Sequence, residues 1–244
     1  ESSPVWSNDG SKIAFLSDRH GSHDVFIISV NGGEAKRLTH QSANDIPLSF
    51  SPDDSKIYFS SARAGSKESS AFPTRGMPQL FSVSVNGGND VLEISLPVFD
   101  LSISKDGKKF IYHDKKGYEN DWRKHQTSSV ARDIWEYLPE EKKFNKISTF
   151  AGEDRSPVFS VDETAIYYLS EKSGSFNVWK KESSGSEKQI TKFDTHPVRF
   201  LSSSRNGTLC FSYNGQIYTM KEGADPQKLY IFSPKEIKDH DMRQ

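Results

Sequence analysis

The sequence predicts an all-β protein, a β-propeller of four-stranded antiparallel blades. One unit is repeated five times, most clearly as SPVWSNDGSKIAFLSD (3–18), LSFSPDDSKIYFSS (48–61) and LSISKDGKKFIYHD (101–114). In every copy a polar turn rich in Asp, Asn or Gly separates two short apolar runs, and no segment shows the periodicity of a helix. The turns recur at intervals of roughly 44 to 56 residues, near the period of about 40–50 residues that is typical of propeller blades.

Each unit divides into four expected strands, because it contains four short runs of β-branched and aromatic residues. The first strands are expected at 4–7, 48–51, 101–104, 157–160 and 198–202, and the second at 12–17, 56–61, 108–113, 165–170 and 208–213. The third are expected at 24–30, 79–85, 133–138, 177–181 and 216–220, and the weaker fourth at 36–39, 91–94, 145–149, 188–191 and 228–231. The blades then cover 1–41, 42–96, 97–152, 153–194 and 195–232, and the charged segment 233–244 is a linker or tail.

Two further turns support this division. Asn31-Gly32 and Asn86-Gly87 stand between third and fourth strands. Asn-Gly readily adopts the positive φ angles of a two-residue hairpin turn, so both are expected to be hairpin turns.

Composition excludes several classes of function. The 244 residues carry 32 basic and 33 acidic side chains, a formal net charge of −1. Without a basic excess the chain lacks the electrostatic signature of a nucleic-acid-binding protein. No apolar run approaches the roughly 20 residues of a membrane span, so none is expected.

The sequence offers no catalytic constellation. A serine peptidase needs a nucleophile, a base within hydrogen-bonding reach and an oxyanion hole, and no Gly-x-Ser-x-Gly motif is present. We therefore expect no catalytic residue and no cofactor in this chain. His20 and His23, flanked by Asp18 and Asp24, have residue types that can bind zinc, but a polar loop between two strands explains them better.

Two long loops are the first candidate binding surface. Adjacent blades 2 and 3 each carry extra residues between the second and third strands, at 62–78 and 114–132, and these loops are expected to lie side by side. They hold side chains of the types enriched at binding hot spots: Arg63, Phe72, Arg75, Tyr118, Trp122, Arg123, His125 and Arg132. The alternative is that the aromatic residues pack each loop onto its own blade.

The second candidate is one mouth of the central channel. Glu1, Asp45 and Asp154 occupy equivalent positions just before an innermost strand, and Asp100 and His196 lie near the same level. Gathered carboxylates could attract a cation, a basic side chain or a peptide amino terminus. The alternative is that these are solvated loops between blades.

The repeats also resemble a known family. SPVWSNDGSKIAFLSDRHGSHDVFIISVNGGEAKRLT (3–39) is similar to the PD40 repeat of TolB-like propellers. KKGYENDWRKHQTSSVARDIWEY (115–137), FAGEDRSPVF (150–159) and YYLSEKSGSFNVWK (167–180) resemble the propeller of bacterial tricorn-like serine peptidases. The resemblance covers the chain up to Phe232. In that family a propeller precedes a PDZ domain and a catalytic domain of the C-terminal-processing type.

The resemblance implies a non-catalytic propeller that guides or filters peptides or unfolded polypeptide. Its partners would be those substrates and the PDZ and protease domains of the same parent chain, with homo-oligomers left open. The alternatives are a stand-alone TolB-like scaffold that binds protein partners and the propeller cap of a prolyl-oligopeptidase-type enzyme. Because bacterial members of the family are often exported, the resemblance favours the periplasm over the cytoplasm as the location of this protein.

The family pattern usually has a further blade upstream, whereas Glu1 leads directly into a first strand. A propeller with an unclosed edge would expose sheet faces and edges, which whole proteins avoid. We therefore expect part of a six-bladed ring rather than a closed ring of five.

Overall fold

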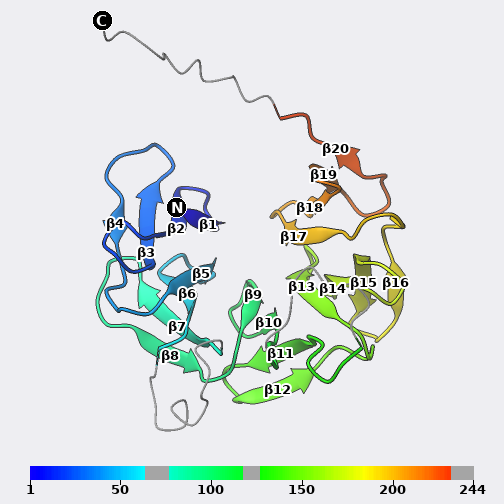
Figure 1. The fold of residues 1–244 in the computed structure, drawn as a ribbon, viewed down its shortest axis with the longest axis horizontal. Helices are drawn as coiled ribbons and strands as arrows, with labels where there is room; N and C mark the ends of the chain where they lie inside the picture. Colours follow the sequence, from blue (N-terminus) through cyan, green and yellow to red (C-terminus); the bar gives the residue numbers. More distant parts are fainter. Residues whose placement is uncertain (64–76, 118–126, 232–244) are drawn as a thin grey trace, which may run out of the picture.

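The computed structural model describes residues 1–63, 77–117 and 127–231, which form twenty strands in five four-stranded sheets (Figure 1). Each sheet is one blade whose strands are adjacent in chain order, and every pairing is antiparallel. The predicted all-β propeller with five four-stranded antiparallel blades is therefore confirmed. Within the three described ranges no helix is long and apolar enough to span a membrane.

The strands agree with the sequence prediction to within a few residues. Blade 1 contains β1 (Ser2–Trp6), β2 (Lys12–Ser17), β3 (Asp24–Ser29) and β4 (Lys36–Arg37). Blade 2 contains β5 (Asp45–Phe50), β6 (Lys56–Ser61), β7 (Gln79–Ser84) and β8 (Val91–Ile94). Blade 3 contains β9 (Phe99–Ile103), β10 (Phe110–His113), β11 (Ile134–Leu138) and β12 (Lys143–Lys146). Blade 4 contains β13 (Asp154–Phe159), β14 (Ala165–Ser170), β15 (Asn177–Glu182) and β16 (Glu187–Gln189). Blade 5 contains β17 (Arg199–Ser203), β18 (Leu209–Tyr213), β19 (Gln216–Met220) and β20 (Gln227–Lys228).

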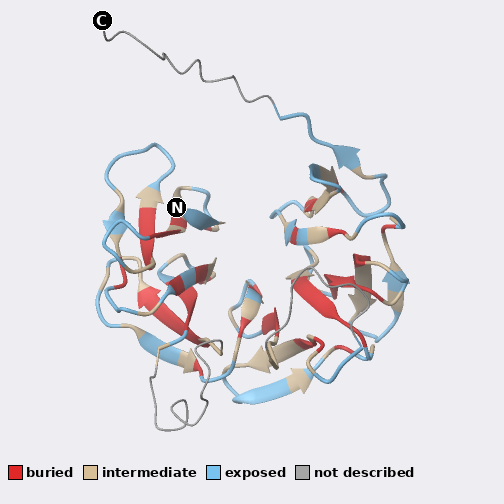
Figure 2. Ribbon diagram, viewed as in Figure 1, coloured by how far each residue is buried: buried red, intermediate tan, exposed pale blue. Residues whose placement is uncertain are grey.

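The blades follow one another around an arc, with blades 1 and 5 at its two ends (Figure 1). The first strand of each blade lies nearest the axis and the fourth lies outermost. Buried residues are most frequent in the second strands of the blades, while the outermost strands are mostly exposed or half-buried (Figure 2). An innermost strand pairs on one side only, so its other edge faces the axis.

The repeated polar turn is closed by hydrogen bonds within six residues. In blade 2 the Ser51 hydroxyl donates to Asp53 Oδ1 at 2.6 Å and accepts from the backbone N–H of Lys56 at 2.9 Å. The other blades repeat the arrangement with Ser7 and Asp9, Ser104 and Asp106, Ser160 and Asp162, and Ser204 and Asn206. Because these hydrogen bonds favour the ionised carboxylate, they lower the pKa of Asp53 and of Asp162 to about 2. The recurring Ser-x-Asp spacing thus specifies the turn locally.

The hydrophobic core is divided among the interfaces between successive blades. Ala14 and Val25 of blade 1 pack in one cluster with Ile57 and Phe59 of blade 2. Equivalent clusters join blades 2 and 3, blades 3 and 4, and blades 4 and 5. Since side chains alternate between the two faces of a strand, the second strands of blades 2, 3 and 4 each contribute to two of these interfaces.

One face of blade 1 lacks such a partner. Ile13 and Phe15 are only half-buried, although their equivalents on the second strands of the other blades are buried. Those equivalents are Ile57 and Phe59, Phe110 and Tyr112, Ile166 and Tyr168, and Leu209 and Phe211. The difference follows from position, because no blade precedes blade 1 in the described arc.

The polar turns also connect neighbouring blades. Asp54 has a left-handed backbone, with φ of 58°, and its carboxylate accepts hydrogen bonds from the backbone N–H groups of Asn8 at 2.7 Å and Asp9 at 2.9 Å. Glu163 has the same φ and accepts from the backbone N–H of Lys105 at 2.7 Å. Acidic residues at this turn position therefore tie blade 2 to blade 1 and blade 4 to blade 3.

The two Asn-Gly turns differ from the predicted two-residue hairpins in the length of the connection. Gly32 and Gly87 have positive φ, as predicted, but the connections from β3 to β4 and from β7 to β8 are longer than two residues. A two-residue hairpin occurs instead at Asn214-Gly215, where both residues have positive φ and Tyr213 pairs with Gln216.

Candidate functional site

A β-bulge recurs at one level of the innermost strands. In blade 3 the pairing shifts between Phe99 and Ser102, and the other four innermost strands shift at the equivalent position. The bulged residues Ser3, Asp100, Ser156 and Phe200 have left-handed φ values of 50°, 48°, 49° and 57°. Blade 2 has Pro47 there, whose ring fixes φ at a negative value. Because bulges redirect side chains and often lie beside functional sites, this bulge level is the candidate site.

Asp100 and Ser156 connect two blades at this level. The Ser156 hydroxyl donates to Asp100 Oδ2 at 2.6 Å, and Nδ1 of the buried His113 lies 3.5 Å from the same oxygen. The ring of Phe99 stacks on that of His113 with centroids 5.7 Å apart. The Asp100 side chain nevertheless remains 53% exposed. Its neighbours therefore hold a carboxylate in place while leaving it open to solvent near the axis.

The aromatic member of the bulge level is Phe200, which is 73% exposed. Close by in the chain, His196 is exposed and lies edge-on to Tyr213, with centroids 6.0 Å apart. Tyr213 also stacks on Phe193 at 4.0 Å. At the bulge position blade 5 thus carries an aromatic ring where blade 3 carries a carboxylate.

The structure separates the predicted channel-mouth residues into two groups. Asp100 and His196 are exposed, whereas Asp45 and Asp154 are buried. Burial raises the pKa of Asp154 to about 6, against hydrogen bonds from Ser170 and Ser148 that favour its ionised form. Asp45 and Asp154 therefore belong to the interior of the blades and do not offer solvent-facing carboxylates.

A repeated cation explains the burial of Asp45. Arg63 lies two residues beyond Ser61 at the end of β6, and its Nη2 pairs with Asp45 Oδ2 at 2.7 Å. The guanidinium lies over the rings of Phe59 and Phe81, at 5.2 and 4.6 Å from their centroids. Blade 1 repeats this arrangement with Arg19, which pairs with Glu1 at 2.5 Å. The recurring Ser-x-Arg spacing was the sequence signal for this arrangement.

Most of the predicted loop surface falls outside the described residues. That is the position of Phe72, Arg75, Tyr118, Trp122, Arg123 and His125. The described members are Arg63, which is ion-paired within its blade, and Arg132, whose Nε lies 3.5 Å from the buried Glu153. The extra residues do lie between the second and third strands of blades 2 and 3, as expected. Their use as a partner surface stays a prediction.

The histidine pair of blade 1 is held by separate partners. His20 stacks on Phe26 with centroids 5.9 Å apart, and His23 Nδ1 lies 3.1 Å from the side-chain oxygen of Asn44. Asp24 is buried and pairs with Arg37 at 2.8 Å. In the part of the chain that the structure describes, no three His, Cys, Asp or Glu side chains gather as a metal site.

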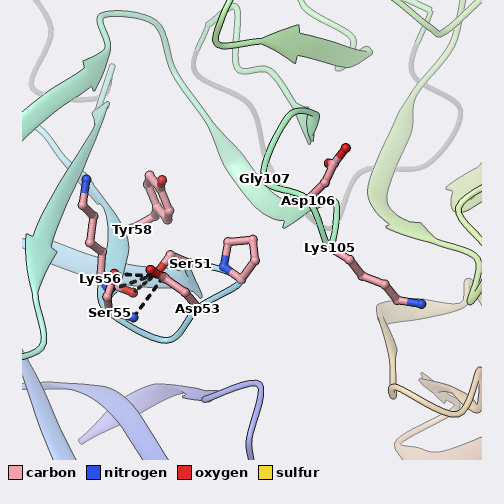
Figure 3. Close-up of a pocket in the computed structure, with 9 residues that line it drawn as sticks. Ser51, Asp53, Ser55, Lys56, Tyr58, Lys105, Asp106 and Gly107 are labelled. Carbon is pink, nitrogen blue, oxygen red and sulfur yellow. Dashed lines mark hydrogen bonds between the residues drawn. The ribbon is translucent and has the colours of Figure 1, made fainter.

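Two hollows lie on the face that carries the polar turns. One, of about 510 Å³, is lined from all five blades, and its charged lining residues are Lys105, Glu163 and Arg205. The other, of about 470 Å³, lies between the turns of blades 2 and 3 (Figure 3). In Figure 3 the hydrogen bonds of Asp53 stay within its own turn, while Lys105 and Asp106 extend from the neighbouring one. These side chains stabilise turns and do not converge on one point.

The sequence matches one protein family along nearly the whole length of the chain. The family described as the tricorn protease N-terminal beta propeller domain matches residues 1–226. The chain belongs to this family. The tricorn protease of Thermoplasma volcanium is 26% identical over 248 aligned positions, which cover 97% of this chain and 22% of that protein.

Solved structures agree on the fold of this tricorn-type propeller. A crystal structure of the tricorn protease superposes with a TM-score of 0.74 at 21% identity, over 95% of this chain and 23% of that one. A putative TolB from Agrobacterium tumefaciens superposes with a TM-score of 0.71 at 20% identity, over 93% of this chain and 79% of that one. The chain therefore spans only about a fifth of the tricorn proteases that it matches.

Proposed function

We propose that this chain is the non-catalytic propeller of a tricorn-like serine peptidase, where it guides or filters peptide substrates and contacts the protease domain of the same parent chain. The observation that carries the proposal is the match to the tricorn N-terminal propeller over residues 1–226. An axis bordered by exposed side chains at the bulge level, with Asp100 and Phe200 among them, supports it.

The innermost strands supply a physical means of guiding a peptide. Each is an edge strand of its sheet, and the free edges face the axis along the inner side of the arc. An extended peptide can hydrogen-bond to such an edge through its own backbone, which gives affinity without strict sequence preference. A folded protein has few free backbone groups and a larger cross-section, so the same axis would admit extended chains and reject folded ones.

Ring closure is part of this proposal. We propose that the arc belongs to a six-bladed ring, and the half-buried Ile13 and Phe15 on the unpaired face of blade 1 support this. A sixth blade would cover these side chains as neighbouring blades cover their equivalents. Closure would also turn the arc into a continuous channel wall, which a filter requires.

The test is to obstruct the axis in the full-length parent protein. Ser3 is exposed at the bulge level, and Cys210 is the only cysteine of this chain. Ser3→Cys with Cys210→Ser, in a parent protein whose other domains are made free of cysteine, therefore provides one attachment point for a polyethylene glycol maleimide. Modification should lower kcat/KM for a long unfolded polypeptide and leave kcat/KM for a very short peptide unchanged. The unmodified variant is the matched control, and equal rates before and after modification would refute guidance through the axis.

A stand-alone TolB-like scaffold is the second candidate. The fold similarity that covers 79% of the putative TolB chain favours it. The two functions differ in what they require of a parent chain. Under the first proposal, adding the separated chain to a parent peptidase that lacks it should restore processing of long polypeptides. Under the second, the chain should bind its protein partners with no peptidase domain attached.

A further inference from the structure

One residue at the bulge level, in blade 5 at the end of the arc, has a side chain that its backbone conformation disfavours. Phe200 has a φ of 57°, and a bulky side chain in the left-handed region is a conformational outlier. Glycine and asparagine adopt this conformation far more readily. Its ring is 73% exposed, and within the described ranges it stacks on no other aromatic ring and lies under no cation. A strained, exposed aromatic residue on an axis-facing strand is typical of a residue kept for binding.

The carboxylate of Asp100 complements this ring. Both residues occupy the same position of the innermost strand, in blades 3 and 5, with Ser156 of blade 4 between them. The Ser156 hydroxyl donates a hydrogen bond to Asp100 Oδ2. The other carboxylate oxygen has no hydrogen-bond partner among the described groups, and the side chain is 53% exposed. The level therefore presents an acidic wall and an aromatic wall on either side of one blade.

Two nearby cations have other partners. Arg155 is buried and pairs with Glu153 at 2.5 Å. Lys115 lies over the ring of Phe99, with its Nζ 5.7 Å from the centroid. His113 faces Asp100 from β10, with its Nδ1 also receiving the backbone N–H of Ser156 at 3.4 Å. An external cation can therefore still approach the open side of Asp100.

We propose that the bulge level binds extended peptides that carry an ammonium or guanidinium group, paired with Asp100 and covered by Phe200. A lysine or arginine side chain matches the chemistry of both walls, because its charged end is polar and its stem is apolar. A cation beside an aromatic face gains a further attraction. This inference rests on the proposed peptide-guiding function and assigns it a preference for basic substrates.

The test compares short labelled peptides that differ only at one central position. An N-acetylated peptide with lysine should bind the chain about fivefold more tightly than the same peptide with norleucine, as expected for a partly exposed ion pair. Asp100→Asn should abolish this difference while leaving the norleucine peptide unchanged, because asparagine tolerates the left-handed backbone. Asp225→Asn, an exposed aspartate on blade 5 away from the bulges, is the matched control. Removing the acetyl group from the norleucine peptide shows whether an amino terminus can supply the cation instead.

Phe200→Asn separates a binding role from a structural one. It should weaken both peptides and raise the urea midpoint of unfolding, because asparagine relieves the backbone strain that phenylalanine maintains. If the midpoint falls instead, Phe200 is structural and the inference fails. Equal binding of the lysine and norleucine peptides to the wild type also overturns the inference but leaves peptide guidance intact. Absence of binding by either peptide overturns both.

Discussion

The sharpest structural prediction concerns Gly207→Ala. Gly207 occupies the left-handed position of the blade 5 turn, with φ of 78°, and a Cβ built there would lie 2.6 Å from Cγ2 of Val161 in blade 4. Gly10 occupies the same turn position in blade 1, with φ of 72°, and a Cβ there meets nothing within 4 Å. The two glycines therefore differ in their neighbours and hardly at all in their backbone.

Comparing the two glycines gives the expected loss in the free energy of unfolding. Placing alanine in a left-handed conformation costs about 1–2 kcal/mol, and Gly10→Ala should show this cost alone. Carbon atoms pack at about 3.5–4.0 Å, so Gly207→Ala adds an overlap of about 1 Å. Valine has little χ1 freedom with which to move aside, and overpacking costs about 1–3 kcal/mol. Gly207→Ala should therefore lower the free energy of unfolding by about 2–5 kcal/mol, at least about 1 kcal/mol more than Gly10→Ala.

Urea unfolding monitored by tryptophan fluorescence gives the free energy of unfolding of both variants, with the same dependence on urea concentration assumed for each. Val161→Ala supplies the decisive comparison, since it removes the methyl group that the new Cβ would meet. In that background Gly207→Ala should cost no more than Gly10→Ala, and the double-mutant cycle isolates the overlap. Equal losses for the two glycine variants, or an excess cost of Gly207→Ala that persists without the valine methyl groups, would refute the packing of these two turns.

Three further predictions address the links between blades, the buried carboxylates and the long loops. Asp54→Asn should lower the free energy of unfolding by about 1–2 kcal/mol, because the Asp54 carboxylate accepts hydrogen bonds from the turn of blade 1; unchanged urea midpoints would contradict the link. Since burial raises the pKa of Asp154 to about 6, the folded state binds a proton more tightly than the unfolded chain, and stability should fall as pH rises from about 4 to 6, by up to about 3 kcal/mol. Asp154→Asn should flatten this dependence in urea midpoints measured across that range, and an equally steep profile in the variant would show that another group is responsible. Trp122→Ala should weaken binding of the adjoining domains, measured by calorimetry, by about 2 kcal/mol without unfolding the propeller. Lys143, which is exposed on β12, supplies the control, and Lys143→Ala should bind as the wild type does. Wild-type affinity in the Trp122→Ala variant would show that the loop only packs onto its blade.

Arg37, on the fourth strand of blade 1, would not serve as a control for the long-loop comparison. From the sequence this arginine is simply a polar residue on a fourth strand. In the structure its Nη2 pairs with the buried Asp24 at 2.8 Å, and its Nε donates to the carbonyl oxygen of Thr39 at 2.8 Å. Arg37→Ala would leave a buried carboxylate without this partner and would destabilise blade 1 for reasons unrelated to binding.

The sequence by itself determined the blades. The Ser-x-Asp turn is closed by groups within six residues, as Ser51, Asp53 and Lys56 show, so its formation depends on near neighbours in the chain. Alternation of apolar residues then sets which side chains of each strand face a neighbouring blade, and five repeats of turn and strand require a propeller. The insertions in blades 2 and 3 were visible for the same reason, since they only lengthen one connection.

Tertiary structure alone decided which polar residues remain exposed. Asp45, Asp100 and Asp154 look alike in the sequence, each close to the start of an innermost strand. The strand pairing places Asp45 and Asp154 opposite Ser61 and Ser170, where neighbouring blades bury them, whereas Asp100 falls on the bulge and stays exposed. A shift of one position, or a bulge, moves a side chain to the other face of a sheet, and that register depends on pairing between segments distant in the chain. The bulge at Phe200 arises in the same way, because extra residues on one strand are defined only by the partner that they oppose.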